Sequence, residues 1–474
     1  MPRTLRTALL LLCTCVFTWS ASAQTEKPNI IWIVSDDCGY ADFSMHGSDT
    51  PTPRIDSIAN DGVRFTNAYA TACVCSPARA ALLTGRYQQR FGHEFNVPGG
   101  RDESHGLPLT ETLISDVLHD AGYRTIAIGK WHLGSADHFL PTARGFTDFY
   151  GFLQGGRGYF PVTTGRRAGT LLRDTEPIAD ENFDYLTDHL ADEAVRYIED
   201  STDGPFFMYL AFNGTHSPFH TTDADLAAAD GDAIAAMTIA LDRAVGKVLD
   251  ALDAHGLAED TLVVFANDHG GTRSHDNGPL NGSKGTLWEG GLRVPFVMRW
   301  PGVIDAGRVV EEPIITLDLF PTALAAAGID ESPGEPLDGI NLLPHLADGG
   351  DAIAQRTLYW KLGDRWAVRN GDLKLCVPGG RRGGTTMQLF DLANDLGEQR
   401  DLADDRPEDV ARLLALYEAW AATHAPPAWE EQERSAGDAQ REGREGRGGR
   451  GDRGEQGGRG SQRERGNRRR GGRE

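Results

Sequence analysis

The chain has 474 residues, of which 40% are hydrophobic and 24% are charged. This composition is ordinary for a globular protein and excludes disorder as its general state, while the length suits one large domain that carries a smaller one. The 47 Lys and Arg residues against 69 Asp and Glu give a formal net charge of -22, which argues against nucleic acid as a partner.

The first 23 residues have the features of a secretory signal. Arg3 and Arg6 precede an apolar run over residues 8–17, and Ala21-Ser22-Ala23 forms a small-residue cleavage site. The apolar run is too short to span a bilayer, and no second run follows. The sequence therefore predicts cleavage after Ala23, no stable membrane insertion, and a periplasmic or secreted mature protein.

Four cysteines remain beyond this signal, which are Cys38, Cys73, Cys75 and Cys376. They are too few for a disulfide framework in a chain of this length, and no disulfide is expected.

Four continuous apolar runs, rich in β-branched and aromatic residues, predict strands that are buried on both faces. They cover residues 29–34, 125–128, 206–212 and 261–266. Helical patterns lie between them, notably over 113–118 and 241–252, and each stops before a glycine. This alternation predicts an α/β fold with a mostly parallel sheet and helices on both faces.

Each of the four runs ends in residues that carry charge or can bind a metal. In chain order these are Asp36 and Asp37, Lys130 and His132, His216, and Asp268 and His269. Ligands of such sheets bind at the carboxyl ends of the strands, so the four endings favour one shared site. An Asp after a strand is about as often a helix cap, and a histidine such as His216 can be a satisfied loop residue.

A helix is predicted to begin at Cys75. Pro77 suits its first turn and Gly85 the position after its last turn. The helix start and the nearby Arg79 would lower the pKa of the Cys75 thiol, which favours a nucleophilic thiolate. The alternative is a small buried side chain, which a lone cysteine usually is.

The pattern changes after Pro344. Short strand-like segments at 357–360, 365–368 and 373–375 precede an apolar-periodic helix around Leu413 and Trp420. They predict a small antiparallel sheet with one helix. We expect a catalytic domain over residues 24–345 and a C-terminal α+β subdomain over 346–425.

The segment 430–474 has 13 Arg against 10 Asp or Glu, many glycines and almost no apolar residue. It cannot bury enough surface to fold, so it predicts a disordered Arg/Gly-rich tail.

Cys75-Ser76-Pro77-Ala78-Arg79, continued by Leu83-Thr84-Gly85-Arg86, resembles the Cys-x-Pro-x-Arg signature of the formylglycine-dependent sulfatases of the alkaline phosphatase superfamily. Further landmarks at fitting spacings extend this resemblance from Lys27 to about Ala422. They are Asp36-Asp37-Cys38-Gly39-Tyr40, Thr52-Pro53-Arg54, Gly129-Lys130-Trp131-His132, Asn267-Asp268-His269-Gly270 and Lys284-Gly285-Thr286.

The resemblance implies an alkaline-phosphatase-like fold and a hydrolase of sulfuric esters. It implies that a maturation enzyme converts Cys75 to formylglycine, and that one Ca²⁺ is bound by Asp36, Asp37, Asp268 and His269 together with the modified Cys75. Three carboxylates suit a hard cation. His269 stands where asparagine is commoner in this family, which leaves Mg²⁺, Mn²⁺ or Zn²⁺ less excluded.

The resemblance also implies a mechanism. A hydroxyl of the hydrated aldehyde at residue 75, polarised by the metal and Arg79, attacks sulfur. Lys130, His216 and Lys284 surround the sulfate, and His216 protonates the leaving alcohol, alone or with Lys284. His132 helps to deprotonate the second hydroxyl, so that sulfate leaves and the aldehyde reforms.

Export and a separate subdomain favour a sulfated glycan over another sulfated small molecule as substrate. Residues chosen by position and type for its binding are Arg157, Trp288, Arg365, Arg381 and Arg382. Alternatives are a phosphodiesterase or phosphonate monoester hydrolase of the same superfamily, an arylsulfatase without carbohydrate preference, and a non-catalytic binder of sulfated glycans.

Overall fold

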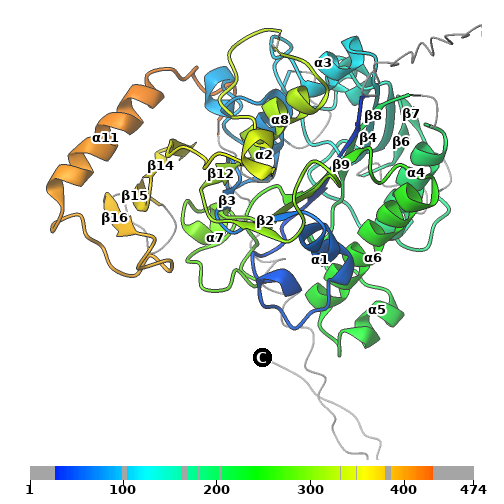
Figure 1. The fold of residues 1–474 in the computed structure, drawn as a ribbon, viewed down its shortest axis with the longest axis horizontal. Coiled ribbons are helices and arrows are strands. Elements are labelled where there is room, and N and C mark those ends of the chain that lie inside the picture. The colour runs from blue at the N-terminus through cyan, green and yellow to red at the C-terminus, as the bar shows by residue number, and fades with distance from the viewer. Residues whose placement is uncertain are drawn as a thin grey trace, which may run out of the picture. The chain divides into compact units, whose positions relative to one another are not determined.

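The computed structural model describes residues 27–98, 104–161, 169–178, 181–201, 204–330, 333–347, 350–378 and 386–430 (Figure 1). The predicted signal, the predicted tail beyond Glu430, and Arg381 and Arg382 lie outside these residues. All described residues belong to one compact unit, so the boundary near residue 345 stays a prediction. Within these residues, we find no helix with the length and apolar character needed to cross a membrane.

The described part of the chain contains a mixed sheet of ten strands in the order β11-β2-β10-β9-β1-β8-β4-β5-β6-β7. The strands are β1 (Asn29–Ser35), β2 (Val63–Phe65), β4 (Arg124–Lys130), β5 (Asp148–Phe152), β6 (Leu172–Arg173), β7 (Glu176–Pro177), β8 (Phe206–Ala211), β9 (Thr261–Asn267), β10 (Phe296–Arg299) and β11 (Arg308–Val310). Central strands β9, β1, β8, β4 and β5 are mutually parallel, while β10, β6 and β7 pair antiparallel. The predicted mostly parallel sheet is confirmed.

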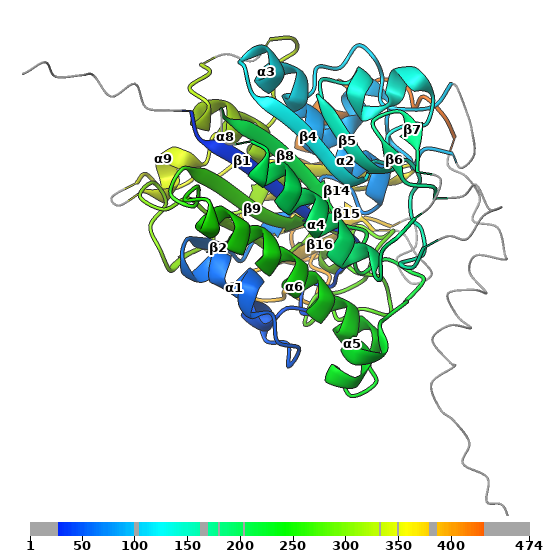
Figure 2. The same cartoon turned by 90° about the vertical axis from the view of Figure 1, so that its right-hand side faces the viewer.

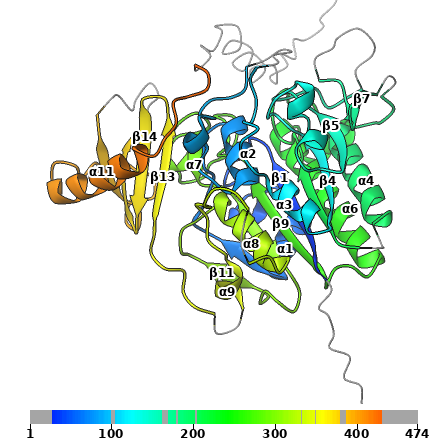
Figure 3. The ribbon, with the colours of Figure 1, turned by 90° about the horizontal axis from the view of Figure 1, so that it is seen from above.

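Helices cover both faces of this sheet. They are α1 (Pro53–Asn60), α2 (Cys75–Thr84), α3 (Ile114–Asp120), α4 (Leu186–Glu199), α5 (Asp223–Ala228), α6 (Ala233–Ala254), α7 (Glu289–Leu292), α8 (Leu319–Ala326) and α9 (Leu343–Leu346). Short 3-10 turns are η1 (Ser44–His46), η2 (Gln88–Phe91), η3 (Asp137–Phe139), η4 (Pro141–Ala143) and η5 (Thr316–Asp318). Figure 2 shows α1, α4 and α6 in front of the sheet, and Figure 3 shows α2 and α8 on its other side.

Strand β1 explains why the sequence pattern is continuous rather than alternating. Ile30, Trp32 and Val34 pack into the core beneath α2, α3 and α8, whereas Ile31 and Ile33 pack into the core beneath α1, α4 and α6. Every residue of β1 is therefore buried, as in parallel sheets with two covered faces.

Residues 357–421 form a second sheet with one helix. Strands β13 (Thr357–Leu362), β14 (Arg365–Asn370), β15 (Leu373–Val377) and β16 (Gln388–Asp391) pair antiparallel, and α11 (Pro407–Ala421) packs on them. This confirms the predicted small sheet and helix, although β16 was not predicted. A two-stranded parallel pair is formed by β3 (Ala68–Tyr69) and β12 (Ile314–Ile315). Tyr69 and Ile315 of this pair pack into the hydrophobic core of the second sheet.

Candidate active site

The predicted strand-end residues meet at one edge of the large sheet. Asp36 and Asp37 follow β1, and Asp268 and His269 follow β9, its neighbour on one side. His216 follows β8, its neighbour on the other side, and Lys130 ends β4 beside β8. Because these four strands are adjacent and parallel, their carboxyl ends deliver all these groups to one place.

Three of these side chains, together with Cys75, offer donor atoms to one cation. One donor atom each from Asp36, Cys75, Asp268 and His269 all lie within 4.8 Å of one another, and a second group joins Asp37 and His216 to Asp36 and Cys75. Asp268 Oδ1 is buried without a hydrogen-bond partner, which leaves its lone pairs for a ligand. Three of the six donor residues in the two groups are carboxylates, those of Asp36, Asp37 and Asp268, and carboxylate oxygens fit a hard divalent ion.

The imidazole of His269 is oriented for the same purpose. Its Nδ1 lies 2.9 Å from the carbonyl oxygen of Gly270, an arrangement that turns Nε2 toward Asp37 and Asp268, 3.4 and 3.5 Å away. Burial lowers the pKa of His269, but Asp268 and Cys75 raise it to about 9 in the absence of a metal. A bound cation would replace that proton, so metal binding and proton release are linked.

Cys75 begins α2, after Val74 in an extended conformation. The helix ends at Gly85, whose φ of 65° lies in the left-handed region, so both predicted helix boundaries are confirmed. Cys75 Sγ lies 3.1 Å from His269 Nε2 and 3.7 Å from Asp36 Oδ1. Burial raises the pKa of this thiol, but Lys130 and Lys284 hold it well below its usual value.

Arg79, one turn further along α2, is completely buried and holds Asp268 from behind. Its Nε and Nη2 donate to Asp268 Oδ2 at 3.0 and 2.9 Å, which leaves Oδ1 as the oxygen directed into the site. Its Nη1 donates to the hydroxyl of Tyr209 at 3.3 Å. Tyr209 was not predicted here because its place inside the apolar β8 run is typical of a core residue.

Two lysines face the two aspartates that follow β1. Lys130 Nζ lies 2.6 Å from Asp36 Oδ2, and Lys284 Nζ lies 2.6 Å from Asp37 Oδ1. Burial raises the pKa of Asp36 above its usual value, and Lys130 only partly opposes this. Burial also acts to raise the pKa of Asp37, but Lys284 and His216 outweigh this effect and lower the pKa below its usual value.

Three histidines border the site along the segment Gly155–Gly158. A Cβ on Gly155 would lie 2.8 Å from His132 Cε1, and one on Gly156 would lie 3.1 Å from His216. A Cβ on Gly158 would lie 3.4 Å from His220. The glycines let this segment run directly against the histidines, so it forms a wall of the site. Burial lowers the pKa of both His132 and His216 to about 4.

Asn267 ties the ends of β9 and β1 together, although sequence reasoning gave it no role. Ser35 Oγ donates to Asn267 Oδ1 at 2.9 Å, and Asn267 Nδ2 donates to the carbonyl of Cys38 at 2.7 Å. Its place in the Asn-Asp-His-Gly motif was the available signal.

Three of the residues chosen by position for substrate binding, Arg157, Trp288 and Arg365, are among the described residues. Arg157 is fully buried and paired with Glu181 at 2.7 Å, while Trp288 packs against Phe390 of β16 with ring centroids 5.5 Å apart. Arg365 donates to two backbone carbonyls, those of Leu362 and Gly285. Each of these three side chains therefore bonds to or packs against other residues of this chain.

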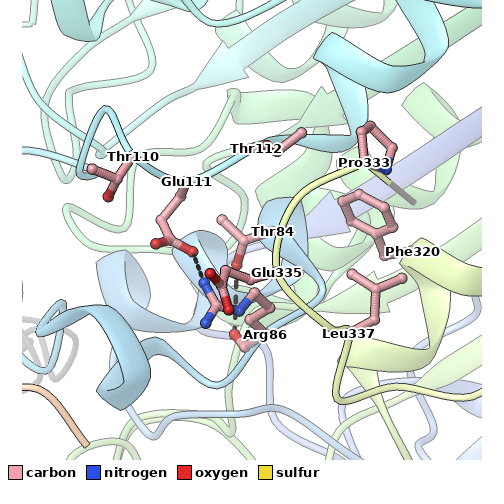
Figure 4. Close-up of a pocket in the computed structure, with 9 residues that line it drawn as sticks. All are labelled: Thr84, Arg86, Thr110, Glu111, Thr112, Phe320, Pro333, Glu335 and Leu337. Atoms are coloured by element: carbon pink, nitrogen blue, oxygen red, sulfur yellow. Dashed lines mark hydrogen bonds and ion pairs between the residues drawn. The ribbon is translucent and has the colours of Figure 1, made fainter. Parts of the chain in front are cut away.

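A small cavity lies at the C-terminal end of α2 (Figure 4). Thr84, Arg86, Glu111 and Phe320 are among its lining residues, and Arg86 is paired with Glu111. It has room for about one water molecule, so it is no second substrate site.

Comparisons with known proteins agree with this geometry. The sulfatase family model matches residues 28–329. N-acetylgalactosamine-6-sulfatase of Homo sapiens is 31% identical over 456 residues, which cover 84% of this chain and 86% of the human one. Steryl-sulfatase of Mus musculus is 31% identical over 522 residues, covering 85% of this chain and 83% of the mouse one.

Solved structures give the same result. Ps i-CgsB, in complex with k-i-k-neocarrahexaose, has a TM-score of 0.80 and 32% identity, covering 90% of this chain and 98% of that one. The PsFucS1 sulfatase from Pseudoalteromonas sp. has a TM-score of 0.74 and 26% identity, covering 84% and 91%. The chain belongs to the sulfatase family, the formylglycine-dependent hydrolases of sulfuric esters in the alkaline phosphatase superfamily.

Proposed function

We propose that this sulfatase removes sulfate from a sulfated carbohydrate, with Cys75 matured to formylglycine and one Ca²⁺ held by Asp36, Asp37, Asp268 and His269. The observation that carries the proposal is the position of Cys75 Sγ. Cys75 begins a helix, its Sγ lies within 4.8 Å of donor atoms from five strand-end residues, and the charges of Lys130 and Lys284 act on it.

The calcium ion would supply positive charge at the residue 75 side chain, and so lower the pKa of a hydroxyl there. The formylglycine would supply a hydrated aldehyde as the nucleophile and a route to release sulfate by elimination, which a serine or thiol lacks. Magnesium, manganese and zinc remain alternatives because His269 adds a nitrogen donor.

The chain's own residues then have distinct tasks. Arg79 fixes Asp268 and adds positive charge beneath residue 75, 4.0 Å from Asp36 Oδ1. Lys130 and Lys284, now paired with Asp36 and Asp37, are placed to neutralise sulfate oxygens as charge builds up in the transition state. His132 has a buried Nδ1 without a partner and serves as the base for residue 75.

His216 is assigned as the acid for the leaving alcohol, because the negative charge of a bound sulfate ester would raise its pKa from about 4. Its Nδ1 lies 2.6 Å from the carbonyl of Ser217, which leaves Nε2 facing the site, 3.6 Å from Asp37 Oδ2. Its side chain is 21% exposed, more than those of Lys130 and Asp37, so it borders the route by which an alcohol would leave.

A carbohydrate substrate is supported by the relatives and by one surface. The relatives' names include an N-acetylgalactosamine-6-sulfatase and a complex with a neocarrahexaose. Beyond His216, the exposed rings of Phe160 and His220 lie with centroids 5.8 Å apart at the far end of the Gly155–Gly158 wall. Phe160 is 40% exposed, and such a ring suits the apolar face of a sugar.

Release of sulfate from a panel of sulfated mono- and oligosaccharides tests the function, with 4-nitrophenyl sulfate and an aryl phosphate diester as comparison substrates. The expected result is a higher kcat/KM for at least one sulfated sugar than for both comparison substrates. Preference for the aryl sulfate would leave an arylsulfatase without carbohydrate preference, and preference for the phosphate diester would contradict the proposal.

Mass spectrometry of the peptide that contains residue 75, from protein co-expressed with a formylglycine-generating enzyme, tests maturation. The peptide is expected to lose its sulfur atom, and an unchanged thiol in fully active enzyme would contradict the proposal. We also propose export through residues 1–23, which N-terminal sequencing of the mature protein would test by finding Gln24 first.

A further inference from the structure

The segment Lys284–Glu289 connects the active site to the C-terminal sheet. At its first residue, Lys284 Nζ donates to Asp37 Oδ1 at 2.6 Å. One residue later, the carbonyl of Gly285 accepts a hydrogen bond of 3.0 Å from Arg365 Nη1, at the start of β14. Further along, the amide of Leu287 donates to the carbonyl of Pro378, which follows β15, at 3.2 Å.

The last residue of this segment is held by a buried group of charges. Lys374 Nζ, on β15, lies 2.8 Å from Glu289 Oε1 and 2.8 Å from Glu398 Oε1. The amide of Glu289 donates to Glu398 Oε2 at 2.7 Å. The side chains of Lys374 and Glu289 are completely buried, where an ionic contact persists only if its charges are well paired.

The charge state of Glu289 agrees with a strong ionic contact to Lys374. Burial acts to raise the pKa of Glu289, but Lys374 and Arg369 lower it to about 2, so its carboxylate stays charged. Tyr69 Oη donates to the other oxygen of this carboxylate at 2.6 Å. We call Glu289, Lys374 and Glu398 the clasp.

We propose that the C-terminal sheet positions the ammonium group of Lys284, with Arg365 as the positioning residue beside it and the clasp as the anchor at the far end of the segment. Only one peptide bond separates the carbonyl that Arg365 holds from the Cα of Lys284. Gly285 has a φ of +82°, so this short connection turns sharply into the site. The amides of Lys284 and Gly285 donate to the carbonyls of Gly271 and Cys73, each at 2.8 Å, and the bond from Arg365 holds the same turn from its other side.

This inference rests on the proposed role of Lys284 at the sulfate group. Displacement of a positioned group by about 1 Å can cost on the order of 10²-fold in rate, so loss of the Arg365 contact should act on turnover. A merely structural role for Arg365 would lower stability without depending on Lys284.

A double-mutant cycle on kcat for 4-nitrophenyl sulfate separates the two roles. It compares the wild type, Arg365→Ala, Lys284→Ala and the double variant, all calcium-loaded and matured. Arg412→Ala is the matched control, because this arginine of α11 belongs to the same subdomain, bonds Asn370 and has no contact with the segment. Thermal unfolding is measured for every variant.

We expect Arg365→Ala to lower kcat about tenfold when Lys284 is present. In the Lys284→Ala background the same substitution should lower kcat less than about twofold. Arg412→Ala should keep kcat within about twofold of the wild type. Arg365→Lys retains a charged donor, so its kcat should fall less than that of Arg365→Ala. If the alanine variant does not fold, Arg365→Lys replaces it in the double-mutant cycle.

Equal losses from Arg365→Ala in both backgrounds, or an unchanged kcat in the folded variant, would overturn the inference while leaving the proposed function intact. If Lys284→Ala itself keeps full kcat, the proposed role of Lys284 fails first and the inference falls with it.

Discussion

Two groups of buried charges lie at opposite ends of the segment Lys284–Glu289, and they differ in what they leave unpaired. In the active site, Asp268 Oδ1 has no hydrogen-bond partner, and donor atoms of Asp36, Cys75 and His269 gather beside it. In the clasp, Glu398 Oε1 also lacks a hydrogen bond, but Lys374 Nζ lies 2.8 Å from it and 2.8 Å from Glu289 Oε1, so both carboxylates are ion-paired. Charges with spare acceptors are available to a ligand, whereas charges paired with one another hold the protein together.

Two cysteines show the same contrast. Cys75 and Cys376 are both buried thiols, and burial raises the pKa of each. At Cys75, Lys130 and Lys284 reverse this effect and the pKa falls, whereas at Cys376 Lys374 opposes burial only in part and the pKa stays raised. The number of cations near the thiol, two lysines at Cys75 against one at Cys376, rather than burial, distinguishes the two environments.

The largest expected effect comes from Cys75→Ala. Loss of the nucleophile should lower kcat on a sulfate ester by at least about 10³-fold. Cys376→Ala, a matched change of a buried cysteine in the other region, should keep kcat within about twofold. Steady-state kinetics on equal amounts of folded protein measure both variants. Similar losses from the two would erase the contrast between the regions.

The clasp should dominate stability. Lys374→Met leaves two buried carboxylates without their shared cation, and we expect a loss of about 3–5 kcal/mol in the free energy of unfolding. Lys247→Met is the control, because Lys247 also lies near two carboxylates, Asp192 at 2.7 Å and Asp188 at 3.4 Å, but its side chain is 34% exposed and that of Asp192 is 59% exposed. It should cost about 1 kcal/mol or less. Urea unfolding measures both, and equal costs would show that the clasp is no stronger than a surface pair.

Metal removal tests whether the unpaired oxygen Asp268 Oδ1 binds a metal ion. Calcium should raise the unfolding temperature of the wild type, and a chelator should reverse this. Asp268→Asn should weaken calcium binding by about 10- to 100-fold, seen as a shift of the calcium concentration needed. Asp148→Asn, which affects an aspartate paired with Arg124 at the other end of the sheet, should leave that concentration unchanged. An unchanged calcium response in Asp268→Asn would exclude Asp268 as a ligand.

The smallest effect is a pH dependence within the clasp. Burial raises the pKa of Glu398 from 4.5 to about 7, although Lys374 opposes this. Between these values the native state holds a proton that the unfolded state releases, so this group's contribution to stability falls as pH rises from 4.5 to 7. Glu398→Gln should therefore gain on the order of 1 kcal/mol relative to the wild type between pH 5 and 7.5.

Urea unfolding of both proteins across this pH range measures the difference between their free energies of unfolding. Because all other groups titrate in both proteins, their effects cancel in this difference. A constant difference, or one that shrinks as pH rises, would contradict the raised pKa. It would also show that the clasp is charged in full at neutral pH.

Local pattern predicted most of the residues that lie together in the candidate site. The four apolar runs are long and buried on both faces, so their strands could be located to within one or two residues. Because parallel neighbours share a carboxyl end, residues that follow these strands had to converge wherever the strands were adjacent. The helix start at Cys75 followed from Pro77 and Gly85, whose backbone preferences are local properties.

Only the tertiary structure decided the rest. Tyr209 bonds Arg79 from inside an apolar strand, and Glu289 meets Lys374 and Glu398 from 85 and 109 residues away. A charged residue in a short strand or loop is most often solvated, so nothing in the sequence indicated that these charges would be buried together. Arg365, chosen from sequence as a substrate contact, donates to the carbonyl of Gly285, and no local pattern indicated that β14 would lie beside this loop.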